Sequence, residues 1–550
     1  MKKLVSIFLA LALILSLSVT VFAADTTNVT IEDPTSTVAA DGVDATRTYS
    51  GYKLLDLTIS LKGDNHHPAD CTGEHADDCY NYAYTVNEKY RSILQHETYT
   101  NAGTSFWGTA GVPAAAEAVT DEQIMEYLSA QTGDNGDVYG TLRTLADRVY
   151  RAILAAGLAA DQTQMSGNGD QIAQGYWLIA DVTNLDNNDD ANSLVILDTK
   201  GEENIVVTPK TAIPTVEKKV KDIEDTEDGN IQDNVWQDSA DHDIDNAPIP
   251  FKLTATLPSN AQYYQSYEMI FHDAMSAGLT LNPDSICVLM YQTKHKADVD
   301  TDMNEGTDVT AYFTKTTSGL EDGCTFEVGC ENVFRINGVT KDTAFVVYYE
   351  ASLNESAIIG AAGNPNEVYL EYSNNPYGEG TGITATDKVI VFTYQLTVNK
   401  TDSHGHDLAG AGFTLYKKNV EGEFVAIGTE LKGEAMTTFS WKGLDDGDYK
   451  LVETTVPQGY NKMADIVFTI SATHSELSDD PQLISLDGDQ MGTGEILTGN
   501  ITRDVVNNTG TILPETGAEG TMLLIVVCTT LVILAAVFMI TRKKMSVYED

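Results

Sequence analysis

Lys400 and Glu453 are the charged residues of this 550-residue chain whose surroundings most directly suggest covalent chemistry. Side chains alternate between the faces of a β-strand, so Lys400 would share a face with Leu396 and Val398, and Glu453 with Leu451. Burial lowers the pKa of a lysine and raises that of a glutamate. A neutral amine can then attack a carboxamide while a protonated acid polarises it and shuttles protons. The alternative is a buried salt bridge that does not react.

Three ordered motifs surround this pair: residues 396–402 (LTVNKTD), 408–416 (LAGAGFTLY) and 443–460 (GLDDGDYKLVETTVPQGY). Together they resemble the collagen-adhesin B-type domain of Gram-positive pilins. The resemblance implies a domain in which a first-strand lysine forms an isopeptide bond with a last-strand asparagine, helped by a glutamate. Carried over residue by residue, it implies Lys400, Glu453 and Asn507. Strand alternation alone does not choose between Asn507 and its neighbour Asn508.

A second lysine, Lys218, lies between two valines on one face of a predicted strand, and Asn374 continues an alternating apolar face. Residues 271–279 (FHDAMSAGL) resemble the segment that supplies the acid in the middle domains of the same pilins, which implies Asp273. We therefore expect a second isopeptide triad. An exposed lysine pair without any bond is the alternative. Lys219 is the neighbouring alternative to Lys218, and Asn375 is the neighbouring alternative to Asn374.

Near the C-terminus, an LPETG motif precedes an uncharged apolar stretch from Met522 to Ile540 and a basic tail at 542–544. This order resembles the cell-wall sorting signal of Gram-positive surface proteins, in which sortase cuts between Thr and Gly and joins the Thr carbonyl to an amine. The apolar stretch, at about 1.5 Å per residue, can cross a bilayer core, with its basic end in the cytoplasm. An ordinary single-span anchor is the alternative. The implied motif residues are Leu513, Pro514, Glu515, Thr516 and Gly517.

The N-terminus is typical of a secretory signal peptide. Lys2 and Lys3 precede an apolar run from Leu4 to Phe22 that closes on small residues. Cleavage is expected near Ala23 or Ala24, so we expect the mature chain to be secreted. An uncleaved N-terminal span is the alternative.

Lys210 is the expected nucleophile for polymerisation. In major pilins of this class, a lysine of a Tyr-Pro-Lys-type motif at the end of the first domain attacks the sortase-bound Thr of another subunit. This chain has Thr208 where Tyr is usual, followed by Pro209 and Lys210. Pro209 lacks the backbone donor that would hold the segment in a sheet, which favours exposure. A simple linker lysine is the alternative.

The cysteines predict local disulfides. One of the six, Cys528, lies in the apolar C-terminal stretch. In an oxidising compartment, disulfides between cysteines that are near neighbours in the sequence leave Cys287 unpaired, although Cys287 could equally pair with Cys324 or Cys330. Residues 66–79 (HHPADCTGEHADDC) could instead bind zinc, but their spacing matches no standard zinc motif. The predicted disulfides are Cys71–Cys79 and Cys324–Cys330.

Composition and patterning predict an all-β chain. Short alternating runs rich in Val, Tyr, Thr and Phe dominate, and a helical period is confined mainly to residues 121–159. The formal charge of -48 makes nucleic acid and anionic membranes poor partners. We find no phosphate-binding glycine loop or nucleophile elbow, so we expect neither an enzyme nor a cofactor. The acidic run 298–302 lacks the glycine that an EF-hand requires, because Met303 follows it.

We therefore expect tandem immunoglobulin-like β-sandwich domains, the first with a helical insertion. The predicted function is the structural shaft subunit of a covalently polymerised pilus, with a monomeric wall-anchored adhesin or an ancillary pilin as the alternative. The expected partners are pilus-specific and housekeeping sortases, further copies of the chain, ancillary pilins, peptidoglycan and host or bacterial surface ligands. The predicted segments are a signal peptide at 1–23, domains at 24–210, 211–394 and 395–509, and the sorting signal at 510–550.

Overall fold

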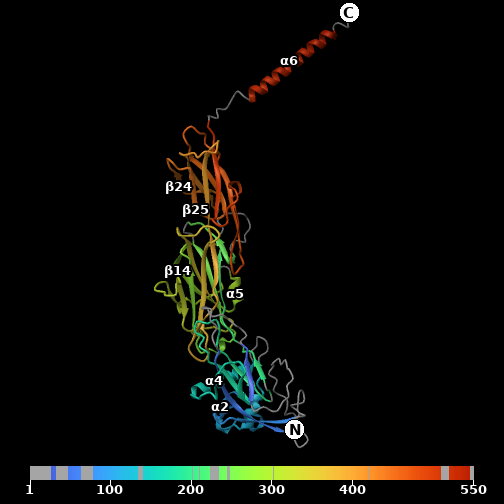
Figure 1. Ribbon diagram of the computed structural model, residues 1–550, viewed down its shortest axis with the longest axis vertical. Helices are drawn as coiled ribbons and strands as arrows, with labels where there is room; N and C mark the ends of the chain where they lie inside the picture. Colours follow the sequence, from blue (N-terminus) through green and yellow to red (C-terminus); the bar gives the residue numbers. More distant parts are fainter. Residues whose placement is uncertain are drawn as a thin grey trace.

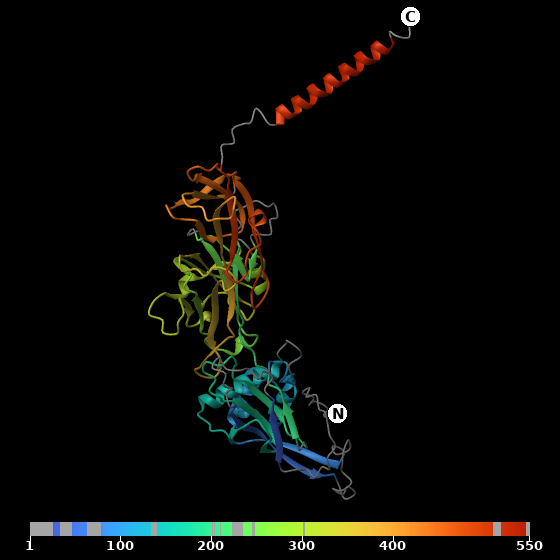
Figure 2. The same cartoon turned by 45° about the horizontal axis from the view of Figure 1, so that its top comes forward.

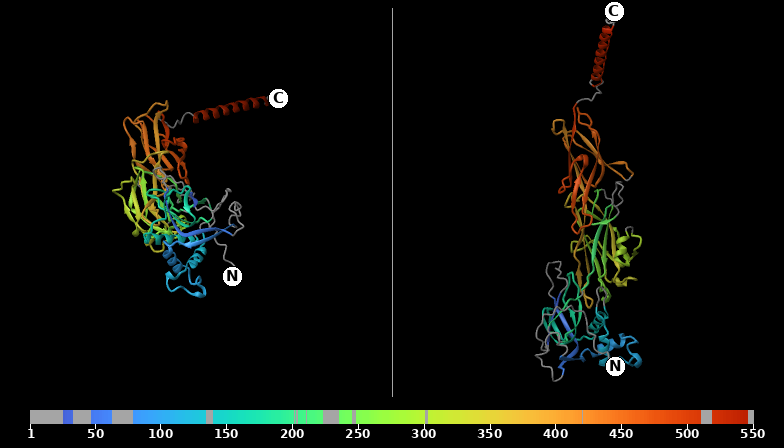
Figure 3. Two further views of the ribbon diagram at one scale, coloured as in Figure 1. Left: turned by 60° about the horizontal axis from the view of Figure 1, so that its bottom comes forward. Right: turned by 90° about the vertical axis from the view of Figure 1, so that its right-hand side faces the viewer.

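Three β-rich bodies follow one another along the long axis of the molecule, in chain order (Figure 1). The C-terminal helix α6 (Glu519–Met545) extends beyond the third body. The structure is a computed structural model, and it describes residues 26–32, 47–62, 79–133, 140–200, 202, 204–209, 211–222, 235–244, 248–300, 303–419, 421–509 and 519–545. The turned views in Figures 2 and 3 show the same order of bodies.

The first body contains two sheets. In the smaller one, β1 (Thr26–Ile31) lies between antiparallel β5 (Asp170–Ala173) and parallel β8 (Asn204–Val207). The larger sheet has the order β3-β2-β6-β7, with β4 beside β2. Its strands are β2 (Tyr49–Leu61), β3 (Tyr80–Val86), β4 (Gln162–Met165), β6 (Gly175–Asp181) and β7 (Leu194–Asp198).

Every residue of β6 is buried, because both faces of its sheet are covered. Trp177 and Ile179 pack with the smaller sheet, whereas Leu178 packs with the helices. The helices are α2 (Arg91–Asn101), α3 (Asp121–Ser129) and α4 (Thr141–Ala155), with short 3-10 turns η3 (Gly108–Ala110) and η4 (Ala116–Ala118).

The helical pattern predicted at 121–159 contains two helices, α3 and α4, and the third helix, α2, was not predicted. The buried face of α2 combines Ile93 and Leu94 with two polar residues, Glu97 and Thr98. Glu97 accepts hydrogen bonds from Tyr127 and from Arg148. A buried polar network therefore replaces the apolar period that would have indicated this helix.

The middle body is a sandwich of two sheets, with strand orders β10-β9-β12-β18-β14-β15 and β11-β21-β19-β13-β17-β16, and with β20 beside β19. Phe251, Phe271, Phe326 and Tyr349 belong to the core between the sheets. The strands of the first sheet are β9 (Val216–Lys221), β10 (Trp236–Gln237), β12 (Ile249–Thr256), β14 (Leu279–Tyr291), β15 (Thr307–Asp308) and β18 (Ala344–Leu353). Those of the second are β11 (Ser239–Asp241), β13 (Met269–Met275), β16 (Thr314–Thr316), β17 (Phe326–Cys330), β19 (Asn364–Ser373), β20 (Thr381–Ile383) and β21 (Asp387–Phe392). The helical turns are η5 (Ala261–Tyr263), α5 (Lys294–Val299), η6 (Thr310–Tyr312) and η7 (Val333–Arg335).

The third body is a smaller sandwich with sheet orders β25-β22-β29 and β24-β23-β26-β27-β28. Its first and last strands, β22 and β29, are parallel neighbours. The elements are β22 (Tyr394–Asp402), β23 (Gly412–Lys418), β24 (Phe424–Lys432), β25 (Thr438–Leu444), β26 (Gly447–Thr455), β27 (Ile466–His474), β28 (Leu483–Asp487), η8 (Asp489–Met491) and β29 (Asn500–Asn507). The expected all-β class, with helices added to the first body, is confirmed.

The middle and third bodies share an almost continuous strand. Only Thr393 separates β21 from β22, and its hydroxyl donates to the Leu444 carbonyl at 3.0 Å. The Asp238 amide donates to Glu476 O at 2.8 Å, and the Asp445 amide donates to a carboxylate oxygen of Asp243 at 2.9 Å. Backbone and side-chain hydrogen bonds therefore fix this joint.

Candidate isopeptide sites

The third-domain site lies between the first and last strands of its sandwich. Lys400 on β22, Glu453 on β26 and Asn507 on β29 are each 1% exposed or less. The parallel register places Lys400 opposite Val505 and Asp402 opposite Asn507. The fold thus brings the three predicted residues into one buried region.

Hydrogen bonds orient the groups of this site. Lys400 Nζ donates to the carbonyls of Thr401 (2.9 Å) and Val505 (3.0 Å). Glu453 Oε1 accepts from Asn507 Nδ2 at 2.7 Å, and its other oxygen accepts from the Met463 amide at 2.8 Å. Asn507 Oδ1 has no hydrogen-bond partner within the described part of the chain. The Glu453 carboxyl group therefore holds the Asn507 carboxamide through its nitrogen, and the carboxamide oxygen of Asn507 is left without a hydrogen bond in the described part of the chain.

The electrostatic environment favours an uncharged amine. Burial lowers the pKa of Lys400, against the opposing effect of Glu453 and Asp402. Asn508, the alternative that strand alternation left open, is exposed at the end of the strand, whereas Asn507 faces Glu453. The geometry can therefore support attack of the Lys400 amine on a carboxamide.

The middle-domain site is a closed set of four buried groups. Lys218 Nζ lies 2.5 Å from Asp273 Oδ2 and 2.6 Å from Asn366 Oδ1. The Tyr349 hydroxyl donates to Asp273 Oδ2 at 2.9 Å and accepts from Asn366 Nδ2 at 2.8 Å. Lys218, Asp273 and Asn366 are all 0% exposed. The lysine, the acid and a carboxamide are thus in direct contact.

Burial acts on both titratable partners of this cluster. It lowers the pKa of Lys218, although Asp273 opposes the shift. It raises the pKa of Asp273, although Lys218 and Tyr349 oppose that shift. Both shifts favour a neutral amine beside a protonated acid, which is the state that amide-forming chemistry requires.

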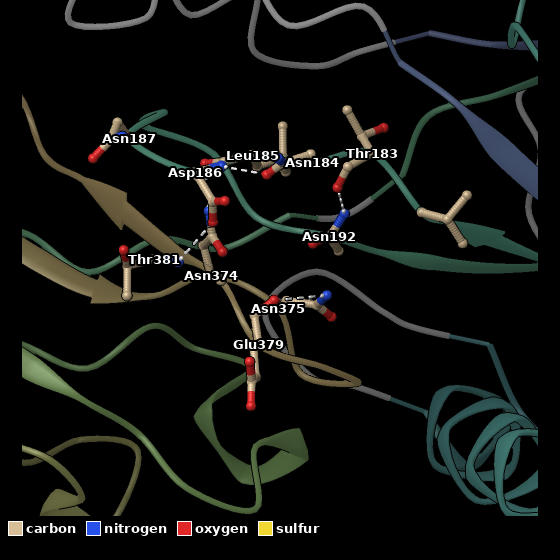
Figure 4. Close-up of a pocket in the computed structure, with 12 residues that line it drawn as sticks. Thr183, Asn184, Leu185, Asp186, Asn187, Asn192, Asn374, Asn375, Glu379 and Thr381 are labelled. Carbon is tan, nitrogen blue, oxygen red and sulfur yellow. Dashed lines mark hydrogen bonds between the residues drawn. The ribbon is translucent and has the colours of Figure 1, made fainter.

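The structure corrects the predicted asparagine of this site, because Asn374 does not contact Lys218. Asn374 is buried at the joint with the first domain, where its Nδ2 donates to the Leu185 carbonyl at 2.7 Å (Figure 4). It follows β19, eight residues beyond Asn366, or about 26 Å along an extended chain. Asn366 has the same strand alternation as Asn374, so the predicted face was right and the position along it was wrong.

The neighbouring alternatives also lie elsewhere. Lys219 Nζ contacts Asp238 and lies 3.3 Å from Glu217 Oε1, on the other face of β9. Asn375 donates to the Glu379 carbonyl at 3.5 Å, in the loop that faces the first domain. Asn366 could have been recognised from the face that precedes Val368, but its selection requires the register of β13 on β19, in which Asp273 opposes Val368.

The predicted disulfide between Cys324 and Cys330 is not formed, and Cys287 is also free. Cys330 ends β17, which begins at Phe326, so the extended strand at about 3.3 Å per residue carries Cys330 beyond the 4.4–6.8 Å Cα separation typical of a disulfide. Cys79 is disulfide-bonded, which removes it from the alternative zinc site. Its predicted partner, Cys71, lies outside the described residues.

The predicted polymerisation residues also fall outside the described part of the chain: Lys210, Leu513, Pro514, Glu515, Thr516 and Gly517. The neighbouring helix α6 contains one segment, Ile525–Arg542, that is long and apolar enough to cross a membrane. This segment overlaps the predicted membrane stretch. The signal-peptide residues lie outside the description as well.

Comparisons with known proteins find one matching family model and several similar proteins. Residues 394–480 match the model of the SpaA prealbumin-like fold domain. Over 270 residues the chain is 29% identical to the trypsin-resistant surface T6 protein of Streptococcus pyogenes serotype M6, covering 46% of this chain and 44% of that protein. The chain therefore spans less than half the length of this curated relative.

Solved pilin structures are also similar to this chain. The T6 backbone pilin of serotype M6 Streptococcus pyogenes is 16% identical with a TM-score of 0.45, over 89% of this chain and 99% of that one. The major pilin SpaD of Corynebacterium diphtheriae is 16% identical with a TM-score of 0.38, over 65% and 86% of the two chains.

Proposed function

We propose that this chain is the shaft-forming subunit of a covalently polymerised cell-surface pilus. In this proposal, sortase joins Thr516 of one subunit to Lys210 of the next, and the last subunit is joined to peptidoglycan. The observation that carries the proposal is the buried contact of Asp273 and Asn366 with Lys218. In the third domain, Lys400 is buried in the same region as the hydrogen-bonded pair of Glu453 and Asn507. Two such groups in successive domains suit a protein whose role is to bear tension.

In the third domain, we propose that Lys400 and Asn507 form an isopeptide bond. The neutral Nζ attacks the carboxamide carbon of Asn507, while Glu453, which is hydrogen-bonded to the amide nitrogen of Asn507, passes a proton toward the departing group. The new bond joins Nζ to this carbon, and the C–NH2 bond breaks. Ammonia leaves with the added proton, and Glu453 recovers a proton from the former amine. The lowered pKa of Lys400 supports the nucleophilic step.

In the middle domain, the same chemistry joins Lys218 to Asn366 with Asp273 as the acid. Three features support this assignment. Lys218 Nζ lies 2.6 Å from the amide oxygen of Asn366, the pKa of Asp273 is raised, and Lys218 and Asn366 are completely buried. Tyr349 adds a hydroxyl that bridges the acid and the carboxamide. This hydroxyl holds Asn366 with its amide group beside the amine.

We also propose the division into domains at 24–210, 211–394 and 395–509, between a signal peptide at 1–23 and a sorting signal at 510–550. Separate hydrophobic cores support the division: one includes Phe251 and Phe271, another includes Phe413 and Phe439. The helices of the first domain cover a third core that includes Leu145 and Val149. The membrane-length segment of α6 supports temporary retention at the membrane before sorting.

A denaturing gel of cell-wall extracts, probed for this chain, tests the function. A ladder of covalent multimers that disappears without the pilus-specific sortase is the expected result. A single wall-linked band in the presence of that sortase would contradict the proposal and favour a monomeric adhesin. Co-migration of other pilins with the ladder would identify ancillary subunits.

A further inference from the structure

A mixed group of potential metal ligands lies on the outer face of the middle domain, away from the isopeptide site. The ligand atoms of His272, Asp322 and Cys324 are all within 4.8 Å of one another. His272 belongs to β13, and the other two lie in the segment that leads into β17. The free thiol of Cys324 is therefore next to an imidazole and a carboxylate.

Contacts from neighbouring strands hold this group in place. His272 Nδ1 lies 2.8 Å from Asp322 Oδ2, and the Cys324 amide donates to the other carboxylate oxygen at 3.1 Å. The Tyr369 ring stacks on the imidazole with centroids 4.5 Å apart, and its hydroxyl donates to Asp322 at 3.0 Å. The register explains this convergence, because His272 lies opposite Tyr369 on β19 and opposite Glu327 on β17.

The two imidazole nitrogens have different surroundings. Nδ1 lies beside the Asp322 carboxylate, whereas Nε2 lies 3.3 Å from Glu371 Oε2. Metal-bound histidines commonly have a carboxylate on the nitrogen that does not bind the metal, because this partner fixes the ring and its tautomer. Glu327 Oε1 lies 3.4 Å from Nδ1, close enough to supply a fourth ligand. Ion pairing with His272 would explain why carboxylates lie around the imidazole, but it would not explain the thiol of Cys324 beside them.

We propose that His272, Asp322 and Cys324 bind one Zn²⁺ ion, with Glu327 or water as the fourth ligand. Sulfur, nitrogen and oxygen together suit tetrahedral zinc, whereas calcium and magnesium favour oxygen ligands. His272 and the next residue, Asp273, lie on opposite faces of β13, and Asp273 faces the core beside Lys218. Zinc would therefore attach the loop containing Asp322 to the strand that supplies the acid of the isopeptide site.

Metal analysis of the full chain, purified in detergent without a metal-binding tag and titrated with Zn²⁺, tests the site. His272→Gln and Cys324→Ser should each remove one zinc per chain. The cluster of partly buried Asp402 with exposed His404 and His406 provides the matched control. The double variant His404→Gln/His406→Gln should retain the zinc bound by His272, Asp322 and Cys324. Unchanged stoichiometry in Cys324→Ser would overturn the proposal.

A measurement on the unmodified chain removes the dependence on variant folding. Zn²⁺ should protect the Cys324 thiol from alkylation, and Co²⁺ in its place should give a thiolate-to-metal charge-transfer band. Cys287, which is free and half-buried, is the internal reference and should react at an unchanged rate. Equal alkylation of Cys324 with and without Zn²⁺ would contradict the site.

The carboxylate behind the histidine gives a graded test. Glu371→Gln should weaken Zn²⁺ binding by about 10- to 100-fold without changing its stoichiometry at saturation. An unchanged affinity would exclude the positioning role of Glu371.

Discussion

The Nζ atom of Lys218 lies 2.6 Å from Oδ1 of Asn366, and both residues are completely buried. The lysine belongs to the first strand of the middle domain and the asparagine to β19 of the opposite sheet. A bond between them would join the two sheets through the core.

Mass measurement distinguishes the two asparagines. If two isopeptide bonds form, the full chain loses two molecules of ammonia, roughly 17 Da each. Asn366→Ala should restore one loss, whereas Asn374→Ala should restore none. Asn374 is the matched control because it is also buried and lies on the same face. The reverse pattern would return the assignment to Asn374.

The acid of each site should be separately required. Asp273→Ala should remove the middle-domain bond and leave the third-domain bond, and Glu453→Ala should do the opposite. Tandem mass spectrometry of proteolytic fragments identifies which crosslink remains. Loss of both bonds in either variant would contradict independent reactions in the two domains.

Polymerisation should depend on Lys210 rather than on nearby lysines. Lys210→Ala should abolish the covalent ladder while wall attachment through Thr516 continues. Lys218 is fully buried and Lys219 is paired with Asp238, so neither can readily reach an external enzyme. Lys219→Ala is therefore the control, and its ladder should persist. An unchanged ladder in Lys210→Ala would remove this lysine from the role.

The joint between the middle and third domains should weaken at alkaline pH. His474 Nε2 lies 3.5 Å from Asp222 and 3.4 Å from Asp241, and Nδ1 lies 2.7 Å from the Ser239 hydroxyl. Burial lowers the pKa of His474, but the two carboxylates outweigh this and raise it to about 10. A histidine with a raised pKa stabilises the fold fully below its unfolded pKa of about 6.5, and this contribution is lost as the pH rises through about 10.

Calorimetry of the full chain between pH 6 and 10.5 measures this effect. The transition that includes the joint should shift to lower temperature across this range. His474→Gln should lower stability by roughly 3–5 kcal/mol at pH 7, because it leaves buried carboxylates without their cation. The variant should also show a flatter pH dependence. Parallel curves for the two proteins would refute the assignment.

The third domain should resist stretching when it is pulled between its ends. A Lys400–Asn507 bond encloses about 100 residues and would stabilise the fold by roughly 4–5 kcal/mol in the chain-entropy estimate. Force then passes through the bond, so the enclosed segment should not extend. Lys400→Ala should unfold with a gain of about 3.3–3.6 Å per released residue. Lys450→Ala, on β26 of the opposite sheet, is the control, and equal extension in all three proteins would exclude the load path.

The resemblance to the collagen-adhesin B-type domain selected Lys400 and Glu453, and local alternation supported the choice, because each lies in a strand whose inward positions are apolar. Local alternation was not enough to select Asn366. Several positions of β19 share the inward face, and the one that meets Lys218 is set by pairing with distant strands. Strand register is a tertiary property that a single sequence indicates only weakly.

The same limit explains the cysteine error. Closeness in sequence suggested a Cys324–Cys330 disulfide, but pairing of β17 with β13 extends this segment and separates the thiols. On the buried face of α2, Glu97 forms an ion pair with Arg148 and occupies a position where an apolar residue would be expected. The apolar periodicity that predicts a helix is therefore incomplete in this segment.

The near-continuity of β21 and β22 has a consequence for recognition by other molecules. Because one strand enters both sheets with only Thr393 between them, rotation of either domain about the long axis would twist a backbone that both sheets hold. The two domains therefore keep a fixed orientation relative to each other. A ligand large enough to touch both would meet a single preformed surface, and its binding would not incur the entropic cost of aligning two independent modules.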